Sequence, residues 1–253
     1  DERRSSRDTP MPTVVVVIDC SPSMGTVDFR VSGATANPVI SRMDAAKAYV
    51  ESFIKQRTRS ASQTQYLLVA SSRPGETPRV CASWGASTTQ FEAELKILRA
   101  FSPFQPLKTA NAPPQAPMNS ALSLAFQLLG RYRLQRGADL CGHGRQPSST
   151  DAAAVLLVTD GIAHSRPDAR VELPSARRPD EDVCRAPFRW DQRLYTVVVK
   201  GDRAAAAGTS SGSSVPESLV VMTDVTGGRH ACASDLAEAV GRGAEHANEV
   251  DAG

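Results

Sequence analysis

Two carboxylates and two hydroxyls in this sequence have the types and the spacing of a cation site. Asp19 begins the pattern Asp-x-Ser-x-Ser, which adds Ser21 and Ser23, and it directly follows a run of β-branched residues. Asp160 directly follows a second apolar run. Hard oxygen donors of this kind suit Mg²⁺ or Mn²⁺ with some waters retained, and they do not suit zinc. The sequence therefore predicts an oxygen-lined metal site, with a coordination position open to the carboxylate of a partner protein.

The same residues also have a purely structural interpretation, because Asp and Ser favour turns after a strand. The position of both carboxylates favours the metal site, because sites in doubly wound sheets lie at the carboxyl ends of the strands.

The elements that must position these side chains alternate between strands and helices. Residues 13–18 (TVVVVI), 153–159 (AAVLLVT) and 194–199 (LYTVVV) are continuous apolar runs, typical of parallel strands buried on both faces. Shorter strands are expected at 66–70, at 79–84 and near His230, and a polar loop is expected before residue 41. Helices are expected at 41–57 and 88–100, after a cap at Asn119, from Pro216 to Gly227, and at 234–247. This order predicts an α/β fold: a doubly wound, mainly parallel, Rossmann-like sheet with helices on both faces.

The domain organisation follows from the same pass along the chain. Residues 11–250 are expected to form one domain, and the polar residues 1–10 a disordered N-terminal extension. Residues 201–214 (GDRAAAAGTSSGSS) are low in complexity and are expected to form a surface loop within that domain.

Composition narrows the function classes. The chain has 253 residues and a net charge of +2, which argues against a basic surface for direct, sequence-specific binding of nucleic acid. No apolar run approaches the ~18 residues that a membrane helix needs, so no membrane partner is expected. The five cysteines are scattered and odd in number, and no signal peptide is recognisable, which favours a reducing, intracellular compartment.

Longer strings of sequence add a resemblance to a known family. The Asp-x-Ser-x-Ser pattern and the second carboxylate resemble the metal-ion-dependent adhesion site of von Willebrand factor type A domains. Over residues 11–246 the chain also resembles the Integrator complex subunit 6 family, through residues 84, 91–96 (FEAELK), 137–147 (GADLCGHGRQP), 188–193 (FRWDQR) and 224–229 (DVTGGR). The string FRWDQR is the most specific of these, because a generic A domain has no reason to carry it.

The resemblance implies a function without catalysis. It implies a nuclear scaffold for protein–protein interaction in small nuclear RNA processing and transcription regulation. The implied partners are other Integrator-like subunits and protein phosphatase 2A, which the scaffold would help to recruit. Asp19, Ser21, Ser23 and Asp160 carry over as metal ligands for Mg²⁺ or Mn²⁺.

A further metal ligand depends on the resemblance, whereas two candidate partner-binding residues are suggested by the sequence itself. In the family a threonine from the loop before the third long helix completes the metal site. An ungapped alignment places Ala116 or Pro117 there, whereas an insertion over residues 110–117 places Thr109 there, and Thr109 is the candidate ligand. Arg189 and Trp190 are candidates for contact with a partner protein, although a Trp entering a buried strand is as often part of the core.

Two alternative functions remain open at the level of sequence. A Mg²⁺-dependent phosphatase of the haloacid-dehalogenase type also has an aspartate after its first strand, but it needs a second carboxylate two residues on, where this chain has Ser21. A secreted adhesion-type A domain would bind a partner carboxylate through the metal, but the cysteine pattern argues against secretion.

Overall fold

A six-stranded sheet forms the centre of the protein. A computed structural model of the chain describes residues 12–31, 38–60, 63–73, 76–102, 117–135, 153–162, 192–201 and 215–250. The strand order is β5-β4-β1-β6-β7-β8, and only the edge strand β5 runs antiparallel to its neighbour. The bounds are β1 Thr13–Ile18, β4 Gln65–Ala70, β5 Arg79–Ala82, β6 Ala153–Thr159, β7 Gln192–Val199 and β8 His230–Ala233. The predicted α/β class is thereby confirmed.

The central strands form because their residues fit a sheet covered on both faces. Every residue of β1 and of β6 is buried, which a run of Val, Ile, Leu and Ala tolerates and an alternating run would not. β1 pairs in parallel with β4 on one side and with β6 on the other. The carboxyl ends of these strands therefore meet at one edge of the sheet, directly after Ile18, Ala70 and Thr159.

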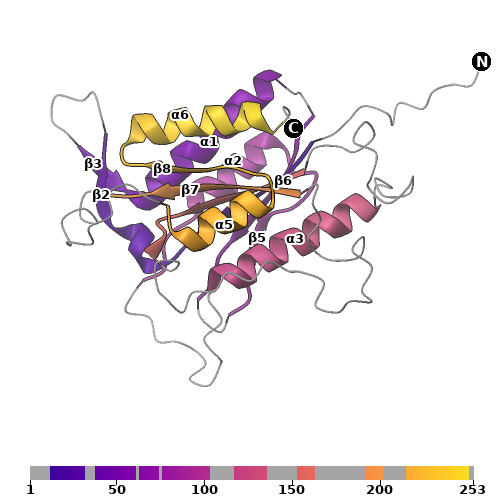
Figure 1. The fold of residues 1–253 in the computed structure, drawn as a ribbon, viewed down its shortest axis with the longest axis horizontal. Helices are drawn as coiled ribbons and strands as arrows, with labels where there is room; N and C mark the ends of the chain where they lie inside the picture. The colour runs from indigo at the N-terminus through magenta and orange to yellow at the C-terminus, as the bar shows by residue number, and fades with distance from the viewer. Residues whose placement is uncertain are drawn as a thin grey trace, which may run out of the picture.

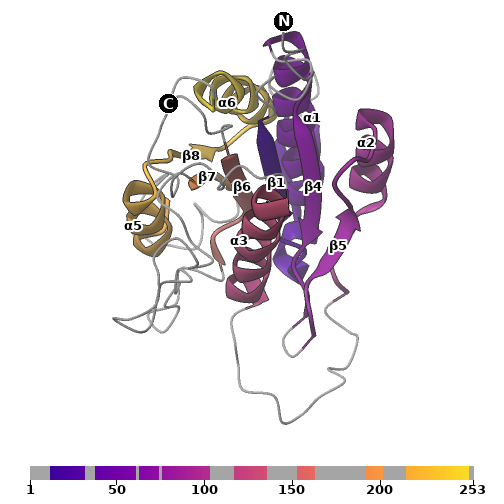
Figure 2. The ribbon, with the colours of Figure 1, turned by 90° about the vertical axis from the view of Figure 1, so that its right-hand side faces the viewer.

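Helices cover both faces of the sheet (Figures 1 and 2). One apolar cluster joins Val14, Val16 and Ile18 of β1 to the helices α1, α2 and α6, and a second joins Val15 and Val17 to α3 and α5. The bounds are α1 Arg42–Ser60, α2 Thr88–Ile97, α3 Pro117–Gln135, α5 Glu217–Val225 and α6 Leu236–Glu249. Alternate residues of one strand thus supply the two halves of the core.

Apart from shifts of a few residues at the ends of elements, the structure differs from the sequence prediction in two places. The segment between β1 and α1 contains the short helix η1 (Pro22–Gly25) and an antiparallel pair, β2 (Val27–Arg30) and β3 (Val39–Ser41), where a loop was expected. The helix α3 begins at Pro117, so Asn119 lies inside it and is not its cap, because proline suits the first turn of a helix. Residues 1–10 and 202–214 lie outside the described residues.

Within the described ranges, no helix combines the length and the apolar character needed to cross a membrane.

Candidate divalent-cation site at the carboxyl edge of the sheet

The loop that follows β1 is held by backbone hydrogen bonds to three neighbouring segments. The Asp19 N–H donates to the carbonyl of Val158 at 2.9 Å, which continues the pairing of β1 with β6 beyond the end of the strand. The Cys20 N–H donates to the Ser71 hydroxyl at 2.8 Å, and the Cys20 carbonyl accepts from the Phe101 N–H at 2.8 Å. These contacts fix the direction in which the Asp-x-Ser-x-Ser side chains leave the loop.

Asp19 is buried and accepts a hydrogen bond on each carboxylate oxygen. Oδ1 accepts from the Ser21 N–H at 2.9 Å, and Oδ2 accepts from the Thr159 hydroxyl at 2.7 Å. Thr159 also accepts from the Gly161 N–H at 3.1 Å, so one hydroxyl ties the loop after β1 to the loop after β6. The hydroxyls of Ser21 and Ser23 are 3.0 Å apart. The predicted pattern therefore forms one compact group of oxygens.

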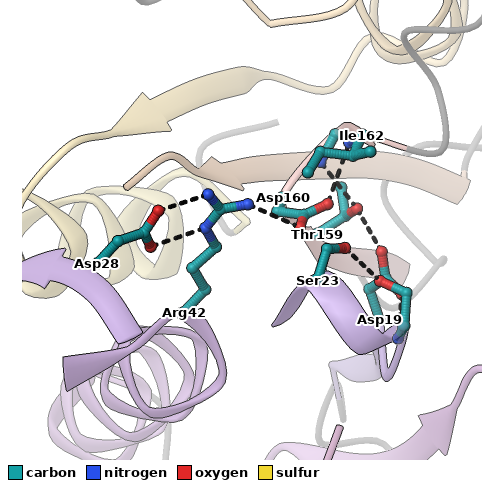
Figure 3. A network of polar contacts seen from close by, with 9 residues as sticks. Asp19, Ser23, Asp28, Arg42, Thr159, Asp160 and Ile162 are labelled. Carbon is teal, nitrogen blue, oxygen red and sulfur yellow. Dashed lines mark hydrogen bonds and ion pairs between the residues drawn. The ribbon is translucent and has the colours of Figure 1, made fainter. Parts of the chain in front are cut away.

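Asp160 stands beside this group and has a basic partner that the sequence pattern did not identify (Figure 3). Its Oδ2 accepts from Nη1 of Arg42 at 3.0 Å, and its Oδ1 accepts from the Ile162 N–H at 3.0 Å. The Arg42 guanidinium also donates from Nε and Nη2 to the two oxygens of Asp28, at 2.9 and 2.6 Å. Arg42 thus forms a bidentate ion pair with Asp28 and one hydrogen bond with Asp160.

The Arg42 ion pairs lie inside the protein. Arg42 is 4% exposed, Asp28 8% and Asp160 4%. Gly201, which follows β7, leaves the space that Asp28 occupies: a Cβ at Gly201 would lie 1.9 Å from Asp28 Oδ1. The carboxylate of Asp28 is therefore packed against the backbone of the sheet edge as well as paired with Arg42.

The electrostatics of the site indicate an excess of negative charge. Burial raises the pKa of Asp19 above its usual range, and the nearby charge of Asp160 raises the pKa further, while the hydrogen bonds from Ser21 and Thr159 oppose the shift. Burial alone would lower the pKa of Arg42, but the hydrogen bonds and charges of Asp28 and Asp160 outweigh burial and raise it. Two carboxylates that repel each other in a buried setting are an arrangement that a cation relieves.

The donor set fits a divalent cation of the Mg²⁺ or Mn²⁺ class. Asp19, Asp160, Ser21 and Ser23 offer only oxygens, and both serines are partly exposed. In the part of the chain that the structure describes, no three His, Cys, Asp or Glu side chains gather as they would in a zinc centre. A cation bound here would depend on the serine hydroxyls together with the two carboxylates.

The sequence prediction located four of these residues and missed two. Asp19, Ser21, Ser23 and Asp160 lie together, whereas Thr109, Arg189 and Trp190 lie outside the described residues. Asp28 and Arg42 were not predicted. A signal for Arg42 was present: it precedes Ala46, Tyr49 and Phe53 at spacings of four, three and four, so a charge begins an apolar helical stripe.

The chain is similar in sequence to several curated proteins. It is 33% identical over 231 residues to Integrator complex subunit 6 of Danio rerio, an alignment that covers 88% of this chain and 23% of that protein. It is 31% identical to Integrator complex subunit 6-like of Homo sapiens, with 88% of this chain and 24% of that protein covered. The chain thus spans about a quarter of the length of these relatives.

Solved structures share the fold at low sequence identity. The protein BatB from Bacteroides thetaiotaomicron superposes with a TM-score of 0.54 at 11% identity, and the superposition covers 96% of this chain and all of that one. A D319A mutant of the PilB minor pilin from Streptococcus sanguinis gives a TM-score of 0.51 at 14% identity, with 99% of this chain and 63% of that chain covered.

The family model of the von Willebrand factor type A domain matches residues 14–162. That stretch contains β1, the Asp-x-Ser-x-Ser loop and β6 with its terminal carboxylate. The predicted resemblance is thereby confirmed: the chain belongs to the von Willebrand factor type A domain family, and it is similar to Integrator complex subunit 6 over most of its length.

Proposed function

We propose that this chain is a non-enzymatic docking domain of an Integrator-like complex in the nucleus. The observation that carries the proposal is the similarity to Integrator complex subunit 6 over 88% of the chain, which extends well beyond the segment that the A-domain model matches. The near-neutral charge supports binding to proteins over binding to RNA. The proposed role is to hold partner proteins, among them other complex subunits and protein phosphatase 2A, in small nuclear RNA processing and transcription regulation.

The carboxyl-edge site is the proposed docking point. Asp19, Ser21, Ser23 and Asp160 would hold Mg²⁺ or Mn²⁺, with Thr109 as the further candidate ligand. A bound divalent cation supplies a Lewis acid that can accept a carboxylate of the partner. The chain's own contribution is to orient the oxygens: Thr159 fixes one oxygen of Asp19, and the Ile162 N–H fixes one oxygen of Asp160.

Affinity purification tests the docking role. A tagged chain is expressed in cells, and the proteins that co-purify from nuclear extract are identified for the wild type, for Asp19→Ala and for Asp224→Asn, a control at an exposed aspartate on α5. Complex subunits and the phosphatase are expected with the wild type and the control and are expected to be depleted with Asp19→Ala. Repeated absence of both from the wild-type sample would overturn the proposal.

Calorimetric titration with Mn²⁺ and Mg²⁺ tests the metal separately. The Ser21→Ala/Ser23→Ala variant removes two proposed ligands without changing any charge, and it is expected to bind at least about tenfold more weakly, in keeping with the loss of two ligands to a hard cation. Ser83→Ala, at an exposed serine outside the site, is the matched control. Equal affinity in all three proteins, or no heat with the wild type, would remove the cation from the proposal.

An enzymatic role would give a different result. A haloacid-dehalogenase-type phosphatase needs an acid two residues after its aspartate, and Ser21 stands there with its hydroxyl near Ser23. Turnover of a generic phosphomonoester by the wild type that disappears in Asp19→Asn would favour that role over docking.

A further inference from the structure

Arg42 gives the carboxyl-edge site a cation of its own. We propose that its guanidinium competes with the divalent cation for Asp160 and thereby sets the metal affinity of the site, an inference that rests on the proposed metal binding. The motivating geometry is the single bond from Arg42 Nη1 to Asp160 Oδ2, at 3.0 Å, beside the Asp-x-Ser-x-Ser group. Arg42 acts on Asp160 and is not itself a ligand of the metal.

Both oxygens of Asp160 already have donors. Oδ1 accepts the Ile162 N–H, which is a local contact within the loop after β6, and Oδ2 accepts Arg42, which lies 118 positions away in sequence. A cation that uses Oδ2 must share this oxygen with the guanidinium or displace it. Displacement costs a charge-assisted hydrogen bond in a buried setting, where such bonds are strong.

Asp28 keeps the guanidinium in place. It accepts two hydrogen bonds from Arg42, so the guanidinium stays paired with Asp28 even when its hydrogen bond to Asp160 is broken. Asp28 is in turn confined by the close approach of Gly201. The guanidinium can therefore give up Asp160 to a metal ion without becoming an unpaired buried charge, and it can return to Asp160 when the metal leaves.

The charges of the cluster match this role. Asp19, Asp28 and Asp160 carry three formal negative charges, and Arg42 carries one positive charge. The cluster therefore has a net formal charge of two negative units, which one divalent cation neutralises. Replacing both Asp28 and Arg42 with neutral residues leaves the same total, because only Asp19 and Asp160 then remain charged. A double substitution at these positions thus removes the competitor for Asp160 Oδ2 while the net charge of the cluster stays constant.

The experiment compares Mn²⁺ affinity in three variants of the full chain by calorimetry. Asp28→Asn/Arg42→Met removes the competitor at constant charge. Asp28→Asn alone leaves Arg42 with only Asp160 as a charged partner. Glu245→Gln/Arg242→Met neutralises an exposed ion pair on α6, with a distance of 2.8 Å, and is the matched control. Thermal unfolding without metal is recorded for each variant.

The two substitutions at the site are expected to change the Mn²⁺ affinity in opposite directions. The Asp28→Asn/Arg42→Met variant is expected to bind Mn²⁺ about tenfold more tightly than the wild type, the factor that corresponds to one charge-assisted hydrogen bond that no longer has to be broken. Asp28→Asn is expected to bind more weakly than the wild type, and the α6 control equally. A wild type that binds no Mn²⁺ would overturn the proposal, because the inference rests on metal binding by the wild type.

Other outcomes overturn the proposal. Equal Mn²⁺ affinity in the wild type and the double variant would show that Arg42 does not compete for Asp160. If the double variant does not fold, unchanged or tighter binding by Asp28→Asn would still overturn the competition. If no variant bound Mn²⁺, both the competition by Arg42 and the metal site would be overturned. The co-purification of partner proteins would still decide the docking function.

Discussion

His246 of α6 is a titratable side chain in the core between α6, α1 and β7. It is 3% exposed, and its Nδ1 lies 2.6 Å from the hydroxyl of Tyr49 on α1. The ring of Tyr195 on β7 packs beside it, with a distance of 5.5 Å between the ring centroids. Burial lowers the pKa of His246 from 6.5 to about 4, so the imidazole is neutral in the folded protein at neutral pH.

This shift predicts a loss of stability in acid. Between pH 6.5 and pH 4 the unfolded chain binds a proton at His246 that the folded chain does not, so the free energy of unfolding falls as the pH falls through that window. The shift corresponds to a loss of about 3 kcal/mol by pH 4. Urea unfolding at a series of pH values measures the loss.

The control for this prediction is His246→Asn, which keeps a polar group near the Tyr49 hydroxyl but does not titrate. Carboxylates contribute to the pH dependence of both proteins, so the informative quantity is the difference between the two slopes. The wild type should lose more stability than the variant between pH 6.5 and pH 4. Parallel curves would contradict a neutral, buried imidazole.

At the residue scale, sequence reasoning located the part of the site that one short motif encodes. Asp19, Ser21 and Ser23 lie within five positions, and Asp160 follows an apolar run of the same kind as the one before Asp19, so pattern alone brings them together. Arg42 pairs with residues 14 and 118 positions away. No local spacing encodes such a pairing, because it depends on how the β2–β3 pair and β6 are placed around the start of α1.

At the scale of elements, the packing of α6 against α1 depends on a glycine. A Cβ at Gly243 would lie 2.4 Å from the carbonyl oxygen of Tyr49 and 3.1 Å from Cβ of Ser52, both on α1. The backbones of the two helices therefore approach each other at this point. Gly241, two residues earlier in α6, has nothing within 4 Å of the same added atom.

The two glycines give opposite predictions for the same substitution. Gly243→Ala should lower the free energy of unfolding by about 1 to 3 kcal/mol, because the methyl group forces the helices apart. Gly241→Ala should raise it by about 0.5 to 1 kcal/mol, because alanine is the better helix former and the site is open. Denaturant unfolding measures both. A stabilising Gly243→Ala would show that the helices are not packed as closely as described.

The helices and strands also differ in how clearly the sequence predicts them. β1 and β6 were predicted with their bounds because every residue in them is buried and all but one threonine in each are apolar. The β2–β3 pair was missed, since β2 has four residues, β3 has three, and the exposed, buried, buried, exposed pattern of β2 does not alternate as a half-buried strand would. The start of α3 was missed because Asn119 is a good cap residue, but Pro117 begins the helix two positions earlier.

At the scale of the whole molecule, the stretch that the family model matches is smaller than the folding unit. That stretch ends at residue 162, before β7, β8, α5 and α6. β6 pairs with β7 over seven residue positions, and the α1 residues Tyr49 and Phe53 are fully buried in the same core cluster as Ala239 and Ala247 of α6. Removing the later elements would expose one side of β6 and one face of α1.

A chain that ends at residue 162 is therefore expected not to fold cooperatively. It should lack near-ultraviolet circular dichroism and a sigmoidal thermal transition, and it should bind a hydrophobic dye, because a large apolar surface stays exposed. The chain with the same start that ends at residue 250 is the control. A cooperative transition in the shorter chain would show that β7, β8, α5 and α6 are an addition to an independent core.

The central position of β1 has a consequence for synthesis. β1 comes before all its partners in the chain, and it pairs with β4, about 50 residues later, and with β6, about 140 residues later. Until both arrive, a six-residue segment of β-branched residues has two unpaired edges, which is the type of segment that assembles with copies of itself. Asp19 places a charge directly after this segment, as protective residues do in such sequences. We therefore expect the carboxylate that is proposed to hold a metal in the finished protein also to lower the tendency of the nascent chain to aggregate.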